Sequence, residues 1–63
     1  MATIYFWDIG DWHKLATYDK DTATKVVHDP LIYRILKTTE MCAVDISTGE
    51  ILAHQNLKDM TSA

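Results

Sequence analysis

Segment 41–57 carries the strongest structural signal in this chain, a pattern typical of a β-hairpin. Between its two apolar halves, Ser47-Thr48-Gly49 predicts a three-residue loop, because glycine readily adopts the positive φ that closes such a loop. An antiparallel strand pair is therefore expected here, and the rest of the fold has to cover it. The apolar positions that alternate along the first strand are Cys42, Val44 and Ile46.

Both faces of this hairpin are apolar. With a three-residue loop, Val44 faces Leu52 and Cys42 faces His54. One face packs against a helix in this interpretation, and the other is left as an apolar patch of the kind that usually marks an interaction surface. We therefore expect a self-association surface made of Ala43, Ile51 and Ala53.

The N-terminal segment predicts a second strand pair. Residues 2–7 are mostly β-branched or aromatic and fit one strand, with Ile4 and Phe6 on one face and Tyr5 and Trp7 on the other. Because both faces are bulky and apolar, this strand is expected to be central or covered on both sides. Gly10 between two aspartates predicts a turn, and segment 15–18 predicts a short second strand.

Segment 22–28 fits two structures. It alternates like a strand, and it also fits a helix capped by Asp21 whose apolar stripe continues beyond the segment. Pro30 disfavours a continuous helix, so a strand or irregular segment is slightly favoured. A helix is expected from Pro30 onwards, because Asp29 suits the N-cap and proline suits the first helical position. Its expected core stripe is Leu31, Ile32, Ile35 and Leu36.

These elements predict an α+β fold, a small antiparallel sheet of four or five short strands with one helix packed on one face. The alternative is an all-β, small barrel-like fold in which segment 32–36 is another strand. We expect a single compact domain over residues 1–57 and a flexible tail over residues 58–63, which are small and polar.

Composition limits the classes of function. A chain of 63 residues has a marginal core, so oligomerisation would add useful apolar burial. The net charge of −3 argues against a general nucleic-acid binder, whose affinity comes from neutralising phosphates. Cys42 is the single cysteine, and neither a signal peptide nor a membrane-spanning run is recognisable. A cytoplasmic protein is expected, in a host cell if the gene is carried by a phage.

Catalytic and metal-binding patterns are weak. Asp8, Asp11 and His13 lie close in sequence, but aspartate in a glycine-containing turn is ordinary turn chemistry. The three histidines and Cys42 lack the spacing of a zinc site, and a Cys42–His54 nucleophile pair has little room for a pocket. No phosphate-binding, hydrolase or dinucleotide motif is present. We therefore expect no enzyme, no metal and no cofactor.

The aromatic residues indicate protein binding. Tyrosine and tryptophan dominate the energetics of protein interfaces, and here they alternate with aspartates in the first eighteen residues. This combination suits an acidic-rimmed surface that meets a basic patch on a partner. The predicted partner-binding residues are Tyr5, Trp7, Asp8, Asp11, Trp12 and Tyr18.

The sequence thus predicts a small non-enzymatic module, a homo-oligomer, that binds a larger protein and regulates or inhibits it. Small size and surplus apolar surface are typical of accessory proteins carried by phages and mobile elements. Two alternatives stay open. One is a nucleic-acid-binding module that uses surface aromatics, and the other is a small metal-binding protein with its site near Asp8, Asp11 and His13.

Overall fold

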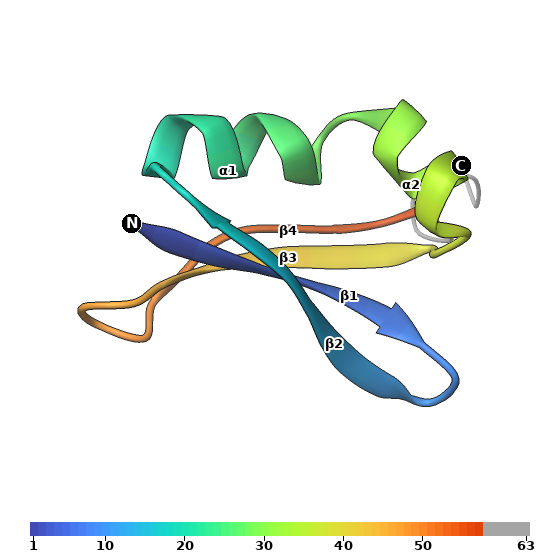
Figure 1. The fold of residues 1–63 in the computed structure, drawn as a ribbon, viewed down its shortest axis with the longest axis horizontal. Helices are drawn as coiled ribbons and strands as arrows, with labels where there is room; N and C mark the ends of the chain where they lie inside the picture. The colour runs from blue at the N-terminus through green and yellow to red at the C-terminus, as the bar shows by residue number, and fades with distance from the viewer. Residues whose placement is uncertain (58–63) are drawn as a thin grey trace.

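The computed structural model describes residues 1–57, which form an antiparallel four-stranded sheet with two helices on one face (Figure 1). The strand order is β2-β1-β3-β4, so β2 and β4 are edges and the sheet does not close. The predicted α+β class is confirmed, with two helices in place of one, and the barrel-like alternative is wrong. The elements are β1 Ala2–Asp8, β2 Asp11–Tyr18, α1 Lys20–Val27, α2 Pro30–Leu36, β3 Glu40–Asp45 and β4 Ile51–Asn56.

The central strands supply most of the sheet's contribution to the core. Ala2 and Ile4 of β1 and Met41 and Ala43 of β3 are fully buried beneath the helices. Strand β1 pairs with β2 on one side and with β3 on the other, as its apolar character on both faces predicted. Because successive side chains alternate, Tyr5 and the other odd-numbered residues of β1 lie on the opposite face.

Each hairpin contains one irregularity that moves a leucine into the core. In β2 the pairing skips Leu15, and in β4 it skips Leu52, and both side chains pack against the core cluster. The predicted pairing of Val44 with Leu52 is therefore wrong, since Val44 pairs with Ile51. The pairing of Cys42 with His54 is confirmed. Strand β2 also begins four positions earlier than predicted, at residue 11 rather than residue 15.

Residues 46–50 separate β3 from β4, so the loop of the C-terminal hairpin is longer than the predicted three residues. Gly49 has a φ of +75°, as the turn requires, and its N–H donates to the Asp45 carbonyl at 2.7 Å. The Asp45 N–H donates in turn to the Glu50 carbonyl at 2.8 Å. Ile46, predicted in the strand, therefore lies in the loop and is 59% exposed.

Segment 20–27 is the helix α1, so the favoured strand or irregular interpretation is wrong. The N-cap is Asp19 rather than Asp21, and its carboxylate accepts from the Thr22 N–H at 3.2 Å and from the Thr22 hydroxyl at 2.7 Å. These hydrogen bonds hold the pKa of Asp19 below its usual value. Ala23 and Val27, four positions apart, face the sheet and are fully buried.

Helix α2 begins as predicted, with Asp29 as N-cap and Pro30 in the first turn. Its predicted core stripe is wrong at two positions, because Leu31 and Ile35 are 56% and 67% exposed. The residue that enters the core is Tyr33, which is 2% exposed. The helix ends at Leu36, and its C-cap Lys37 has a φ of 56°, in the left-handed region.

Polar contacts join the two helices to each other and to the sheet. The Tyr33 hydroxyl donates to the Val27 carbonyl at 2.6 Å and approaches the Gln55 carbonyl of β4 at 3.4 Å. Near the start of α1, Lys20 Nζ lies 3.0 Å from a carboxylate oxygen of Asp45. Bonding to Lys20, followed by bonding from the Ser47 N–H, lowers the pKa of Asp45.

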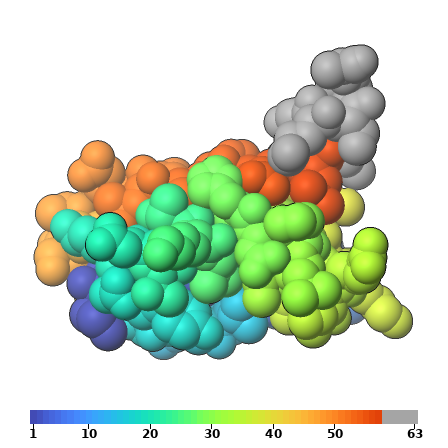
Figure 2. Space-filling view, turned by 90° about the horizontal axis from the view of Figure 1, so that it is seen from above, coloured from blue at the N-terminus to red at the C-terminus, as the bar shows by residue number. Residues whose placement is uncertain are grey.

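Figure 2, seen from the helix side, shows α1 and α2 over the middle of the sheet with β4 along one edge.

The three residues predicted to form the self-association surface, Ala43, Ile51 and Ala53, do not lie on the same face of the sheet. Ala43 pairs with Ala53 under the helices, and Ala43 is 0% exposed, whereas Ile51 lies on the opposite face and is 62% exposed. The irregularity at Leu52 is the cause, because an unpaired residue shifts every later side chain by one position. The predicted flexible tail, residues 58–63, lies outside the described residues.

Candidate functional site

The candidate site is the face of the sheet that the helices leave uncovered. Tyr5 and Trp7 of β1 point to this face, and the pairing places Lys14 and Trp12 of β2 opposite them. On the other side of β1, Cys42 of β3 lies opposite Tyr5. Figure 1 shows both helices on the other side of the sheet, and no described element packs here. We call this surface the open face; its further members are Thr3, Thr17, Glu40, Val44, Ile51 and His54.

Two tryptophans form a pair at one end of the open face. Trp7 and Trp12 are cross-strand partners whose ring centroids lie 5.3 Å apart at an interplanar angle of 76°, an edge-to-face arrangement. This geometry is the favoured one for aromatic pairs and holds both rings in place. Each tryptophan is still 38% exposed, so the pair presents ordered aromatic surface to solvent.

A shallow apolar hollow lies beside this pair. It has a volume of about 260 Å³ and is lined by Tyr5, Trp12, Cys42 and Val44, which come from three strands. Small-molecule sites usually have volumes of roughly 300–1,000 Å³ and enclose their ligand. A smaller, open and apolar hollow fits an apolar side chain of another protein better than a substrate.

The thiol in this hollow is not poised for nucleophilic chemistry. Burial, followed by the charge of Glu40, raises the pKa of Cys42 above its usual value, so the neutral thiol is favoured. His54, its cross-strand neighbour, contacts Glu40 instead, with Nε2 2.5 Å from a carboxylate oxygen. An activated Cys–His pair requires the imidazole to take the thiol's proton.

The candidate metal ligands are spread over the molecule. His13 Nε2 contacts the carbonyl oxygen of Asp8 at 3.1 Å, and His28 Nδ1 contacts Gln55 Oε1 at 2.7 Å. Within residues 1–57, no three histidine, cysteine, aspartate or glutamate side chains come together to hold an ion. The metal-binding alternative near Asp8, Asp11 and His13 therefore gains no support from the geometry.

The structure brings together three of the predicted partner-binding residues, Tyr5, Trp7 and Trp12, on the open face. Asp8 and Asp11 face each other at the end of the β1–β2 hairpin, next to the tryptophan pair. Tyr18 is separated from the others, because it pairs with Ala2 on the side that faces the helices. Alternation along β1 placed Tyr5 and Trp7 on one face, whereas Trp12 was predicted from the cluster of aromatic and aspartate residues in the first eighteen positions.

Several residues of this region were missed. Val44 lies on the open face two positions from Cys42 along β3. Ile51 was predicted for self-association only, and it reaches the open face because the pairing in β4 skips Leu52, which the sequence pattern did not reveal. Ile9, at the tip of the β1–β2 hairpin, is 93% exposed and has a φ of 50°. No local pattern indicates this conformation, because isoleucine is rare in the left-handed region.

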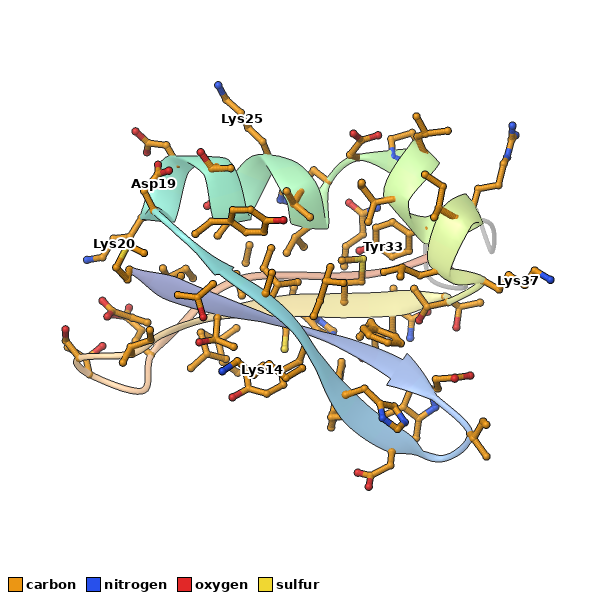
Figure 3. All side chains as sticks on the ribbon, viewed as in Figure 1. Lys14, Asp19, Lys20, Lys25, Tyr33 and Lys37 are labelled. Carbon is orange, nitrogen blue, oxygen red and sulfur yellow. The ribbon has the colours of Figure 1, made fainter. Side chains whose placement is uncertain are left out.

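The charge on the open face bears on the nucleic-acid alternative. Among the strands of the described sheet, Lys14 is the one lysine or arginine, and Figure 3 shows it on the helix-free side. A nucleic-acid platform normally combines stacking aromatics with several phosphate-binding cations. The geometry therefore favours a protein partner over a nucleic acid.

No protein-family model, curated protein or solved structure matches the chain. Among residues 1–57, neither α1 nor α2 has the length and apolar character needed to cross a membrane.

Proposed function

We propose that this chain is a non-enzymatic protein-binding module that regulates or inhibits a larger protein through its open face. The observation that carries the proposal is the ordered pair of Trp7 and Trp12 beside an apolar hollow, on a face that no described element covers. Apolar surface that stays exposed and contiguous in a small protein usually marks an interaction site.

The chemistry of the open face supports this proposal. Tyrosine and tryptophan are enriched among the residues that dominate binding energy, especially where a central pocket excludes water. Tyr5 and Trp12 line the hollow, and the tryptophan pair stands beside it. The face is built on paired strands, so a partner meets a surface that needs little ordering on binding.

The size of the chain suggests how it would act. A small domain that binds through one face changes its partner by covering part of the partner's surface. Occlusion of this kind is the mode we propose for regulation or inhibition, and it is typical of accessory proteins of phages and mobile elements.

Replacing Trp12 with alanine tests this function. The variant loses the wall of the hollow and the edge-to-face contact with Trp7, and we expect it to weaken partner binding by about 2 kcal/mol or more. Immobilised wild-type chain and variants are incubated with lysate of the cells that express the gene, and retained proteins are identified by mass spectrometry. The retained protein is then purified and titrated by calorimetry.

Ile35→Ala is the matched control, because Ile35 is 67% exposed and lies on α2, away from the open face. The proposal requires a protein that wild type and Ile35→Ala retain and that Trp12→Ala loses. Circular dichroism must show that Trp12→Ala remains folded. Equal retention by the two alanine variants would place binding elsewhere and refute the proposal.

Self-association is a separate proposal, and the open face now replaces Ala43 and Ala53, which lie on the helix side of the sheet, as its surface. Ile51 is the one member of the predicted set that lies exposed on the open face, and its cross-strand partner is the half-buried Val44. We expect light scattering to show a mass that rises from monomer to dimer across a concentration series. Ile51→Lys should shift this transition to higher concentration, and an invariant monomer mass in the wild type would contradict the proposal.

A further inference from the structure

We propose that the β1–β2 hairpin is the part of this chain that enters its protein partner, with Ile9 seated in an apolar pocket and Asp8 and Asp11 facing basic residues at the edge of that pocket. The proposal rests on the function proposed above and specifies the chemistry of the partner. Three features of the hairpin end support it, and each is unfavourable in the free chain.

The first feature is the backbone conformation of Ile9. Ile9 and Gly10 have φ values of 50° and 76°, so both residues of this two-residue turn lie in the left-handed region. Turns of this type favour asparagine, aspartate or glycine, and a β-branched residue is strained there. Backbone strain of this kind concentrates at functional sites, where another requirement outweighs it.

The second feature is exposure of the same side chain. Ile9 is 93% exposed, so the free chain gains almost no apolar burial from it. Ile46, in the loop of the other hairpin, is 59% exposed and is not among the residues with positive φ. Strain and exposure thus coincide at Ile9, and a pocket on a partner would supply the missing burial.

The third feature is a pair of like charges. Asp8 and Asp11 are direct cross-strand partners, an arrangement that is destabilising when both side chains carry the same charge. Within residues 1–57, the carboxylates that form ion pairs are Asp45 and Glu40, at the far end of β3 and at its start. No described cation therefore relieves the repulsion at the hairpin end.

Nearby groups leave this end acidic. His13 contacts the backbone carbonyl of Asp8 rather than its carboxylate, and one carboxylate oxygen of Asp11 accepts from the Trp12 N–H at 2.8 Å. Figure 3 shows the Lys14 side chain reaching away from the β1–β2 turn. A partner surface with lysine or arginine at the edge of its pocket would complement this charge.

The hairpin is shaped for insertion. Figure 1 shows the β1–β2 turn projecting beyond the rest of the molecule, away from both helices. Behind the turn, the edge-to-face pair of Trp7 and Trp12 stiffens one side of the hairpin, while Asp8 and Asp11 occupy the alternate positions on the other side. A projecting, stiffened end with an apolar tip fits a cleft better than a flat surface.

Ile9→Asn separates this inference from a structural role for Ile9. Asparagine tolerates the left-handed region, so the variant should melt at a higher temperature than wild type. The protein identified by capture with wild type and Ile35→Ala, once purified, should bind Ile9→Asn at least about tenfold more weakly. Ile46→Asn is the matched control and should bind like wild type.

A second pair of variants tests the charge of the partner. Asp8→Asn with Asp11→Asn removes both carboxylates at the tip, whereas Asp21→Asn with Glu50→Gln removes the same charge at exposed positions elsewhere. We expect the first double variant to associate about tenfold more slowly at low ionic strength and to lose most of its salt dependence, and the second to behave like wild type.

The outcomes distinguish this inference from the proposed function. If Trp12→Ala weakens binding and Ile9→Asn does not, the function stands and the inference is wrong. If neither weakens binding, both are wrong. Equal salt dependence in the two double variants, or a captured partner that proves to be a nucleic acid or a second copy of this chain, would also overturn the inference.

Discussion

Replacing Tyr33 with alanine is expected to leave the chain largely unfolded at 25 °C. Tyr33 is the largest fully buried side chain, and its hydroxyl joins α2 to the last carbonyl of α1, at Val27. Removing a buried aromatic ring costs about 3–5 kcal/mol, and a core of this size rarely supplies more than about 3–5 kcal/mol in total. The loss therefore equals the whole stability of the domain.

Tyr33→Phe is the matched control, because it keeps the ring and removes the hydroxyl. It leaves the Val27 carbonyl without this donor, and we expect a loss of about 1–2 kcal/mol with the fold retained. Far-ultraviolet circular dichroism and urea unfolding measure both variants. A Tyr33→Ala variant with a wild-type urea midpoint would show that the ring does not support the core.

The same residue predicts a loss of stability at high pH. Burial, followed by the charges of Cys42 and Glu40, raises the pKa of Tyr33 to about 12 from a usual value of 10.0. Above pH 10 the unfolded chain releases the phenolic proton while the folded chain retains it, so the free energy of unfolding falls. The fall should reach about 2–3 kcal/mol by pH 12. Tyr33→Phe should lack this component.

Replacing Ile4 with alanine is expected to reduce the free energy of unfolding by about 2–5 kcal/mol, the second largest effect. Ile4 is 0% exposed at the middle of the central strand, between Ala16 of β2 and Ala43 of β3. Both neighbours are alanines, so the site has little side chain with which to fill the cavity.

Two further variants calibrate this loss. Ile4→Val removes one methylene and should cost about 0.5–1.5 kcal/mol. Ile51→Ala makes the same change as Ile4→Ala at a position that is 62% exposed, and it should change the free energy of unfolding by less than about 0.5 kcal/mol. Equal losses for Ile4→Ala and Ile51→Ala would contradict the assignment of the core to the helix side of the sheet.

The parts of the fold that could be predicted are those determined by residues close together in the sequence. Gly49 supplies a positive φ, and Asp29-Pro30 begins a helix, and both signals act within a few residues. The alternation that separates Ile4 from Tyr5 is also local, and it placed Tyr5 and Trp7 on the same face of β1. Each of these predictions needs no knowledge of the rest of the chain.

The wrong predictions for α1 and for the strand pairing concern features that depend on contacts between distant segments. Five of the eight residues of helix α1 are aspartate, threonine or valine, which are weak helix formers. Burial of Ala23 and Val27 against strands far along the sequence stabilises the helix. The irregularities at Leu15 and Leu52 let both leucines reach the core, which alternation by itself forbids. For the same reason the pattern could not place Ile51 on the open face. The strain at Ile9 was missed for a local reason, because isoleucine is rare in the left-handed region.

The position of β1 and β3 at the centre of the sheet also constrains the order in which the chain folds. Each hairpin pairs residues that are close in sequence, whereas the β1–β3 pairing joins Ala2 to Asp45 and closes a loop that contains both helices. Distant pairings of this kind are slow, because the entropy of loop closure is lost before the contacts form. The rate of folding should therefore depend on the residues that pair β1 with β3. Residues of the edge strands β2 and β4 should chiefly affect the rate of unfolding.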